Sequence, residues 1–195
     1  MENDIKSEPF TPPLGGRGAR IFAISGSLRS GSSNHNILKY LGSLLPANVA
    51  YTIYEELALI PPFDPGLDNE TPPAPVVTLR QLLANADAVI ICTPEYAFGV
   101  PGQLKNMLDW LVSSSSLVDK PVSLITASSS GQYAHPSLLL TLGALSANLV
   151  EGASLLVRFI RTKMDTEGNI TDGDTIENLK SVINNLLKTL KLATY

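Results

Sequence analysis

The sequence predicts a three-layer α/β fold, in which a parallel sheet of five strands carries helices on both faces. Three observations favour this class. Short apolar runs alternate with longer amphipathic stretches, most of the apolar runs are nearly continuous, and five of each kind fit into 195 residues. Continuous apolar runs are expected where strands are covered on both faces, so the helices should lie on both sides of the sheet.

The elements can be assigned in order along the chain. The expected strands cover residues 20–25, 50–54, 88–93, 122–127 and 154–159, and all but the second are almost wholly apolar. The expected helices lie near residues 34–45, 75–85, 102–113, 136–149 and 172–192. In the third of these, apolar side chains recur at helical spacing and polar ones fall on the opposite side.

The most economical topology for these elements is flavodoxin-like, with strand order 2-1-3-4-5 and right-handed crossovers. Residues 1–19 are polar and rich in proline and glycine, so we expect a flexible leader there. Residues 20–195 then form a single domain. Residues 58–74 make a long, proline-rich connection, and we interpret the acidic residues around it as solvated surface rather than a metal site.

Composition excludes several classes of partner. A formal net charge of −4 and an isoelectric point near 5.1 argue against binding to nucleic acid. Neither a signal peptide nor an apolar run of the ~18 residues that a membrane span needs is visible, so no membrane partner and a cytoplasmic location are expected. The single cysteine, Cys92, lies in an apolar run and is expected to be a buried, inert thiol.

In this topology a ligand binds beyond the carboxyl ends of the strands, between the first and third strands. The loop after the first strand reads "SGSLRSGSSN". Gly26 and Gly31 allow sharp turns, Arg29 supplies one positive charge, and the helix that follows directs free N–H groups at the loop. We interpret this loop as a site for a single phosphate, since neither a P-loop nor a G-x-G-x-x-G fingerprint occurs. A plain turn before a capped helix stays open as the alternative.

The loop after the third strand reads "TPEYAFGVPGQLKNMLDW". Pro94 and Pro101 restrict the backbone, while Tyr96 and Phe98 offer flat apolar surfaces that suit a planar ring system. The alternative is that these aromatic side chains turn into the core or into a subunit contact. Trp110, in the helix that follows, is a candidate for the core, since large aromatic residues of amphipathic helices are usually buried.

These two loops together resemble the signature segments of the NADPH-dependent FMN reductase family, through "GSLRSGSSNHNIL" and "PEYAFGVPGQLKNMLDWL". The resemblance implies a flavodoxin-like fold that binds FMN. It assigns the FMN phosphate to Ser27, Arg29, Ser32, Ser33 and Asn34. It assigns the flavin ring to Pro94, Glu95, Tyr96, Ala97 and Phe98, and Ser128 is included as a contact from the loop after the fourth strand.

The resemblance also implies a function. NADPH or NADH would deliver hydride to bound FMN, which passes electrons to a small acceptor such as a flavin, quinone, azo compound or metal ion. We nominate no catalytic acid, base or nucleophile and no metal ligand. The resemblance also implies a homodimer or homotetramer, with residues 61–67 and the helix that carries Trp110 as candidate interface elements. A non-enzymatic FMN-binding electron carrier or redox sensor is the alternative function.

Two other classes of protein fit the sequence poorly. A serine hydrolase needs a G-x-S-x-G elbow, which is missing, and only His35 and His135 could serve as its base. Both are expected to be ordinary helix residues. A phosphorelay receiver shares the topology but needs carboxylates at the ends of the first and third strands, which here read "SGS" and "CTPE".

Overall fold

The computed structural model describes residues 18–192, so the predicted leader, residues 1–19, lies almost entirely outside the described residues. Five parallel strands form one sheet in the order β2-β1-β3-β4-β5, as predicted. The strands are β1 (Arg20–Ser25), β2 (Ala50–Tyr54), β3 (Ala88–Thr93), β4 (Pro121–Ser128) and β5 (Asn148–Arg158). The helices are α1 (Ser33–Ser43), α2 (Ala74–Asn85), α3 (Gly102–Asp109), α4 (Ala134–Ala144) and α5 (Gly173–Thr189), with short 3-10 turns η1 (Leu57–Leu59) and η2 (Ile160–Lys163).

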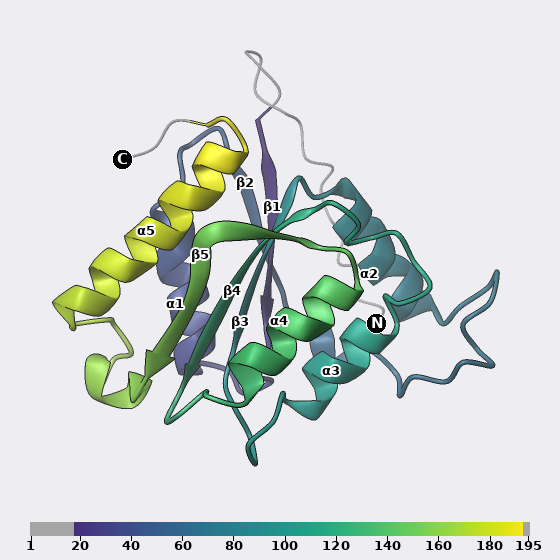
Figure 1. Ribbon diagram of the computed structural model, residues 1–195, viewed down its shortest axis with the longest axis horizontal. Helices are drawn as coiled ribbons and strands as arrows, with labels where there is room; N and C mark the ends of the chain where they lie inside the picture. Colours follow the sequence, from purple (N-terminus) through teal and green to yellow (C-terminus); the bar gives the residue numbers. More distant parts are fainter. Residues whose placement is uncertain (1–17, 193–195) are drawn as a thin grey trace, which may run out of the picture.

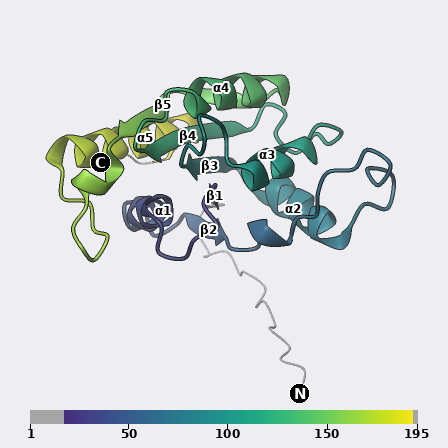
Figure 2. The same cartoon turned by 90° about the horizontal axis from the view of Figure 1, so that it is seen from below.

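The sheet lies between two layers of helices (Figure 1). Figure 2 shows α1 and α5 on one face and α2, α3 and α4 on the other. Side chains of β1 alternate between the layers, as a period of two requires: Ile21 and Ala23 pack with α1 and α5, whereas Phe22 and Ile24 pack with the other helices. The central strand β3 is buried along its whole length, which explains its unbroken apolar sequence.

The boundary between α4 and β5 differs from the prediction. A helix was expected over residues 136–149, but α4 ends at Ala144, and Asn148 already pairs with Pro121 of β4. β5 therefore begins six residues before the predicted start. The strand contains a register shift near Gly152, whose φ is 70° and whose carbonyl accepts a hydrogen bond from Asn185 Nδ2 of α5 at 2.9 Å. This bulge interrupts the alternation of side chains that marks a strand in sequence.

The proline-rich connection between β2 and α2 packs against α3. Trp110 is fully buried and its indole N–H donates to the carbonyl of Pro61 at 2.8 Å, so this side chain belongs to the core and not to an exposed subunit contact. Phe63 packs edge-on against the same indole at 5.1 Å between ring centroids. The expectation that the acidic residues around this connection are solvated is wrong for Asp68, because its carboxylate forms a 2.8 Å ion pair with Arg80.

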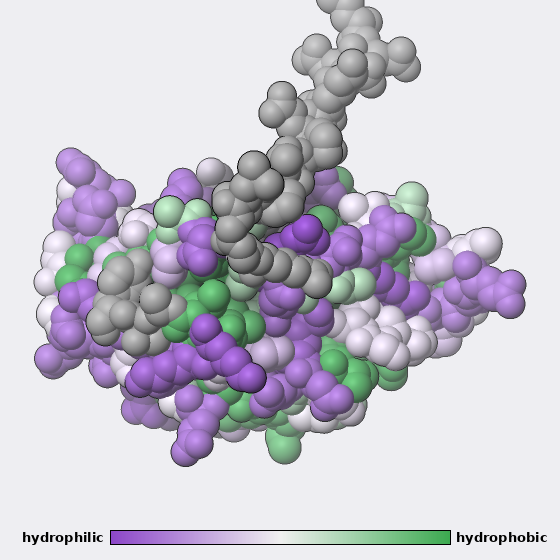
Figure 3. All heavy atoms as spheres, turned by 90° about the horizontal axis from the view of Figure 1, so that it is seen from above, coloured by the Kyte–Doolittle hydropathy of each residue, from purple (hydrophilic) through white to green (hydrophobic). Residues whose placement is uncertain are grey.

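The carboxyl ends of the strands point to the lower edge of the molecule in Figure 1. The opposite end, seen in Figure 3, mixes hydrophilic and hydrophobic residues over its surface. Within residues 18–192, no helix is long and apolar enough to cross a membrane. The same residues contain no group of three or more His, Cys, Asp or Glu side chains placed to hold a metal ion.

Candidate functional site

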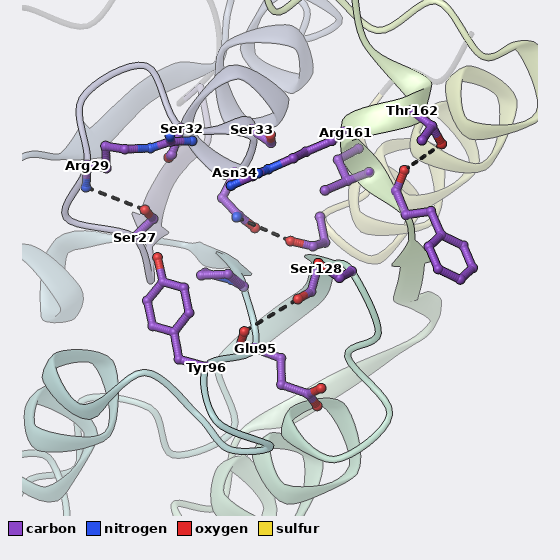
Figure 4. A pocket seen from close by; sticks show the side chains of 15 residues that line it. Ser27, Arg29, Ser32, Ser33, Asn34, Glu95, Tyr96, Ser128, Arg161 and Thr162 are labelled. Carbon is purple, nitrogen blue, oxygen red and sulfur yellow. Dashed lines mark hydrogen bonds between the residues drawn. The ribbon is translucent and has the colours of Figure 1, made fainter.

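A cavity of about 510 Å³ opens at the carboxyl end of the sheet, where the loops after β1, β3, β4 and β5 meet (Figure 4). Its volume falls within the range of roughly 300–1,000 Å³ that is typical of small-molecule sites. The predicted site residues line this cavity, except for Ala97 and Phe98. The lining residues are Ser27, Arg29, Ser32, Ser33, Asn34, Pro94, Glu95, Tyr96, Ala127, Ser128, Ser129, Phe159, Ile160, Arg161 and Thr162.

The loop between β1 and α1 forms one end of the cavity. Gly26 lets the backbone pass close to β3, since a Cβ at this position would lie 2.1 Å from Thr93 Oγ1. Ser32 caps α1 by accepting a hydrogen bond from the His35 N–H at 3.2 Å. Among the described residues, no acceptor is recorded for the backbone N–H groups of Ser33 and Asn34. These donors lie at the positive end of the α1 dipole, an arrangement that favours an anion.

The Asn34 side chain has a structural role that the sequence did not reveal. Its Nδ2 donates to the carbonyl of Ala127 at 3.3 Å, and its Oδ1 accepts from the Cys92 thiol at 3.3 Å. Burial raises the pKa of Cys92, so the thiol stays protonated and able to donate. The amide thus connects α1 to β3 and β4. Asn34 offers the cavity its backbone N–H, whereas its side-chain amide is already bonded.

Two arginines line the cavity, and only Arg29 was predicted from sequence. Arg161 comes from η2, directly after β5, and its side chain points toward the N-terminus of α1 (Figure 4). None of the ion pairs recorded within residues 18–192 includes either guanidinium. The position of Arg161 just beyond a strand end, at the same edge as the other loops, is the sequence signal that could have identified it.

The loop between β3 and α3 forms the other end. Tyr96 and Gly99 exchange backbone hydrogen bonds of 3.0 and 2.9 Å and enclose a two-residue turn. Both turn residues have positive φ, 47° at Ala97 and 60° at Phe98, as in a type I′ hairpin turn. The Phe98 ring is 74% exposed and packs edge-on against Tyr133, with ring centroids 5.2 Å apart. The turn therefore stands at the rim, and its two residues do not line the cavity.

Glu95 links two of the loops. Its carboxylate accepts hydrogen bonds from the backbone N–H groups of Gly131, Tyr133 and Ala134 at 3.1, 2.7 and 2.8 Å, and so caps α4. Burial opposes ionisation of Glu95, but these three hydrogen bonds outweigh it and hold the pKa below its usual range. The carboxylate is turned away from the other labelled side chains (Figure 4). It acts as a fixed structural cap, not as a charge facing a ligand.

Ser128 lies beside Glu95 at the end of β4. Its hydroxyl donates to the Glu95 carbonyl at 3.5 Å, and the side chain is buried at the cavity wall. The two histidines do not line the cavity. His35 approaches Glu55 at 3.9 Å, and the His135 ring is bonded to Thr126 and Ser154 at 2.8 and 3.0 Å. The cavity wall offers no histidine as acid or base.

The cavity fits a ligand that is anionic at one end and flat at the other. One end has unpaired backbone donors and two guanidinium groups, and the other has Pro94, Tyr96 and the aromatic rim. This is the chemistry of a flavin mononucleotide, with a terminal phosphate and a planar ring. The sequence profile of the family described as NADPH-dependent FMN reductase matches residues 19–161. The chain belongs to the NADPH-dependent FMN reductase family.

Relatives and solved structures agree with this assignment. A quinone reductase of Escherichia coli K12 is 34% identical over 171 residues, which cover 82% of this chain and 89% of the relative. An NADPH:quinone oxidoreductase of Arabidopsis thaliana is 31% identical and covers 84% and 88%. The structure of FerB, an NAD(P)H:(acceptor) oxidoreductase from Paracoccus denitrificans, aligns with a TM-score of 0.70 at 22% identity, covering 89% and 97%, and supports the flavodoxin-like fold. The predicted family, fold and FMN cofactor are thereby confirmed.

Proposed function

We propose that this protein uses bound FMN to transfer reducing equivalents from NADPH or NADH to a small acceptor. The observation that carries the proposal is the cavity at the carboxyl edge of the sheet, in a member of the FMN reductase family, with anion-binding groups at one end and aromatic side chains at the other. Relatives named as quinone reductase and azoreductase suggest a quinone or azo compound as acceptor.

The cofactor is proposed to lie across the cavity from α1 to the β3–α3 loop. Its phosphate is assigned to Ser27, Arg29, Ser32, Ser33 and Asn34. Its ring is assigned to Pro94, Glu95 and Tyr96, with Ser128 at the wall and Ala97 and Phe98 at the rim. In this arrangement Asn34 and Glu95 contribute through backbone groups, because their side chains already form hydrogen bonds within the protein.

The side chains of the site bind and orient, and none is proposed to transfer a proton. When bound, FMN supplies the redox chemistry between the nicotinamide and the acceptor. The Glu95 carboxylate is fixed by three N–H donors and stays ionised, so it is unsuited to exchange protons near neutral pH. Backbone N–H groups of the cavity wall can stabilise negative charge on a ring without titrating.

The rim is suited to a planar nicotinamide or acceptor. Tyr96, Phe98 and Tyr133 are 56%, 74% and 49% exposed around the mouth, and together they offer flat apolar faces. Exposed aromatic groups of this size also favour contact with a second copy of the chain, so we propose a homodimer or homotetramer that buries part of this rim. Sedimentation equilibrium at micromolar concentration tests this, and a monomer at that concentration contradicts it.

The decisive experiment is anaerobic reduction of the FMN-loaded protein. Addition of NADPH or NADH is expected to bleach the visible flavin bands, and a quinone added afterwards is expected to restore them. The same mixture without protein is the control. A protein that binds FMN but is not bleached by either nucleotide is an electron carrier or sensor and contradicts the proposal. We also propose a cytoplasmic location for the protein, since the proposed reaction draws NADPH or NADH from the cytosolic nicotinamide pool.

A further inference from the structure

Arg161 stands opposite Arg29 at the phosphate end of the cavity. The two guanidinium groups come from different segments, the β1–α1 loop and η2, yet both line the main cavity (Figure 4). Both also line a smaller cavity of about 250 Å³, together with Ser33. Arg29, Ser33 and Arg161 therefore separate the two cavities, beside the free N–H groups at the start of α1.

Two features of the chain place Arg161 at the phosphate end of the cavity. β5 ends at Arg158, and Phe159 (φ 54°) turns the backbone so that Ile160 is buried and Arg161 is exposed toward α1. The loop that follows is attached to α1, since Asn36 Nδ2 donates to the carbonyl of Gly168 at 3.2 Å. Gly168 has φ 87°, which other residues rarely adopt, and a Cβ there would lie 2.1 Å from Asn36 Nδ2, so a larger residue would strain the turn and displace the Asn36 amide.

No carboxylate among residues 18–192 is recorded in an ion pair with Arg29 or Arg161. Asp165 and Glu167 line the smaller cavity, but the ion pairs recorded within residues 18–192 do not join either carboxylate to an arginine. Asp165 instead accepts hydrogen bonds from backbone N–H groups of its own loop, at 2.9 and 2.8 Å. Two guanidinium groups that face one cavity and form no ion pair with a carboxylate repel each other, and a bound dianion relieves that repulsion.

We propose that Arg161 is a second phosphate-binding residue, which with Arg29 holds the terminal phosphate of FMN from two sides. This inference rests on the proposed function, and it adds a residue that lies outside both loops of the family resemblance. A phosphate carries roughly two negative charges near neutral pH. Two arginines match that charge, whereas Arg29 alone leaves half of it to backbone donors.

The test compares FMN with riboflavin, which has the same ring but no phosphate. Arg161→Ala is expected to weaken FMN binding by about 10- to 100-fold and to leave riboflavin affinity within about twofold of the parent. Arg158→Ala is the matched control, because Arg158 is an exposed arginine three residues away that does not line the cavity, and both affinities should be unchanged. Fluorescence titration of the apoprotein measures both ligands.

Two outcomes overturn the inference. The first is an Arg161→Ala variant that binds FMN as tightly as the parent does. The second is an Arg161→Ala variant that loses riboflavin affinity to the same extent as FMN affinity. Either result with a parent that binds FMN refutes the role of Arg161 and leaves the proposed function intact. A parent that binds neither flavin refutes the proposed function itself.

A second variant tests how Arg161 is positioned. Gly168→Ala is expected to move the loop away from α1 and to weaken FMN binding, again without loss of riboflavin. If Gly168 acts through Arg161, the double variant Gly168→Ala/Arg161→Ala binds FMN about as weakly as Arg161→Ala alone. Losses that multiply in the double variant contradict the positioning role.

Discussion

The β1–α1 loop and the β3–α3 turn lie at the two ends of one cavity, and the backbone of the first is relaxed whereas that of the second is strained. In the first loop the positive φ falls on Gly31, which tolerates it, and Ser32 caps the helix that follows. In the second, two side-chain-bearing residues, Ala97 and Phe98, have positive φ. The comparison indicates that the phosphate end is preformed, while the ring end stores backbone strain in its rim.

The largest expected effect is at the preformed end. Arg29→Ala should weaken FMN binding by about 1.5–3 kcal/mol, because a charge-assisted hydrogen bond to phosphate is lost. The free energy of unfolding of the apoprotein should hardly change, since the Arg29 side chain forms no ion pair within the described residues. Lys39→Ala, on an exposed face of α1 outside the cavity, is the control. Equal FMN affinity of the Arg29 variant and the parent contradicts the assignment.

The second prediction concerns Glu95, which joins the ring end to α4. Glu95→Gln should lower the free energy of unfolding by about 0.5–2 kcal/mol at neutral pH, the usual range for a lost helix cap. The substitution turns an NH₂ group toward backbone donors that the carboxylate now satisfies. Glu151→Gln, an exposed glutamate of β5, is the control, and denaturant unfolding provides the measurement.

The effect of Glu95 should depend on pH. The folded-state pKa lies below the usual value, so the carboxylate stabilises the fold above the unfolded pKa of about 4.3, and this stabilisation is lost as the pH falls through the folded pKa. The parent and Glu95→Gln should therefore differ most near neutral pH and converge in acid. A difference that is constant with pH contradicts the role of the ionised cap.

The smallest effect is expected in the strained turn. Asparagine adopts positive φ more readily than alanine, so Ala97→Asn should raise the free energy of unfolding by about 0.5–1 kcal/mol. Ala97→Val is the opposing control, since a β-branched residue is poorly accommodated at φ 47° and should destabilise the protein. Equal free energies of unfolding for the parent, Ala97→Asn and Ala97→Val would contradict backbone strain in this turn.

Much of the fold could be predicted because local patterns and global topology agree. β1, β2 and β3 begin and end at the predicted residues, where apolar runs meet polar loops. The start of β5 could not be predicted, because the bulge near Gly152 breaks the alternation and leaves an apolar stretch that also suits a helix. Its pairing with β4 is set by tertiary contacts, which a local pattern does not contain.

The site was predictable where it follows a contiguous motif and unpredictable where distant segments meet. The phosphate loop could be identified from its own sequence. For Arg161 the sequence offers only its position just beyond the end of a strand, because its place in the cavity also depends on the contact between Asn36 and Gly168, which are 132 residues apart. The cap that Glu95 provides for α4 bonds it to residues that lie 36, 38 and 39 positions further along the chain, and this cap has no sequence signature.

The measurement that tests the account most directly is the ratio of FMN to riboflavin affinity in the parent protein, at low and high salt. FMN is expected to bind at least about tenfold more tightly than riboflavin at low salt, because the phosphate gains charge-assisted hydrogen bonds, and this advantage is expected to shrink as salt screens the charges. Equal affinities for the two flavins at low salt would contradict a phosphate site at the start of α1.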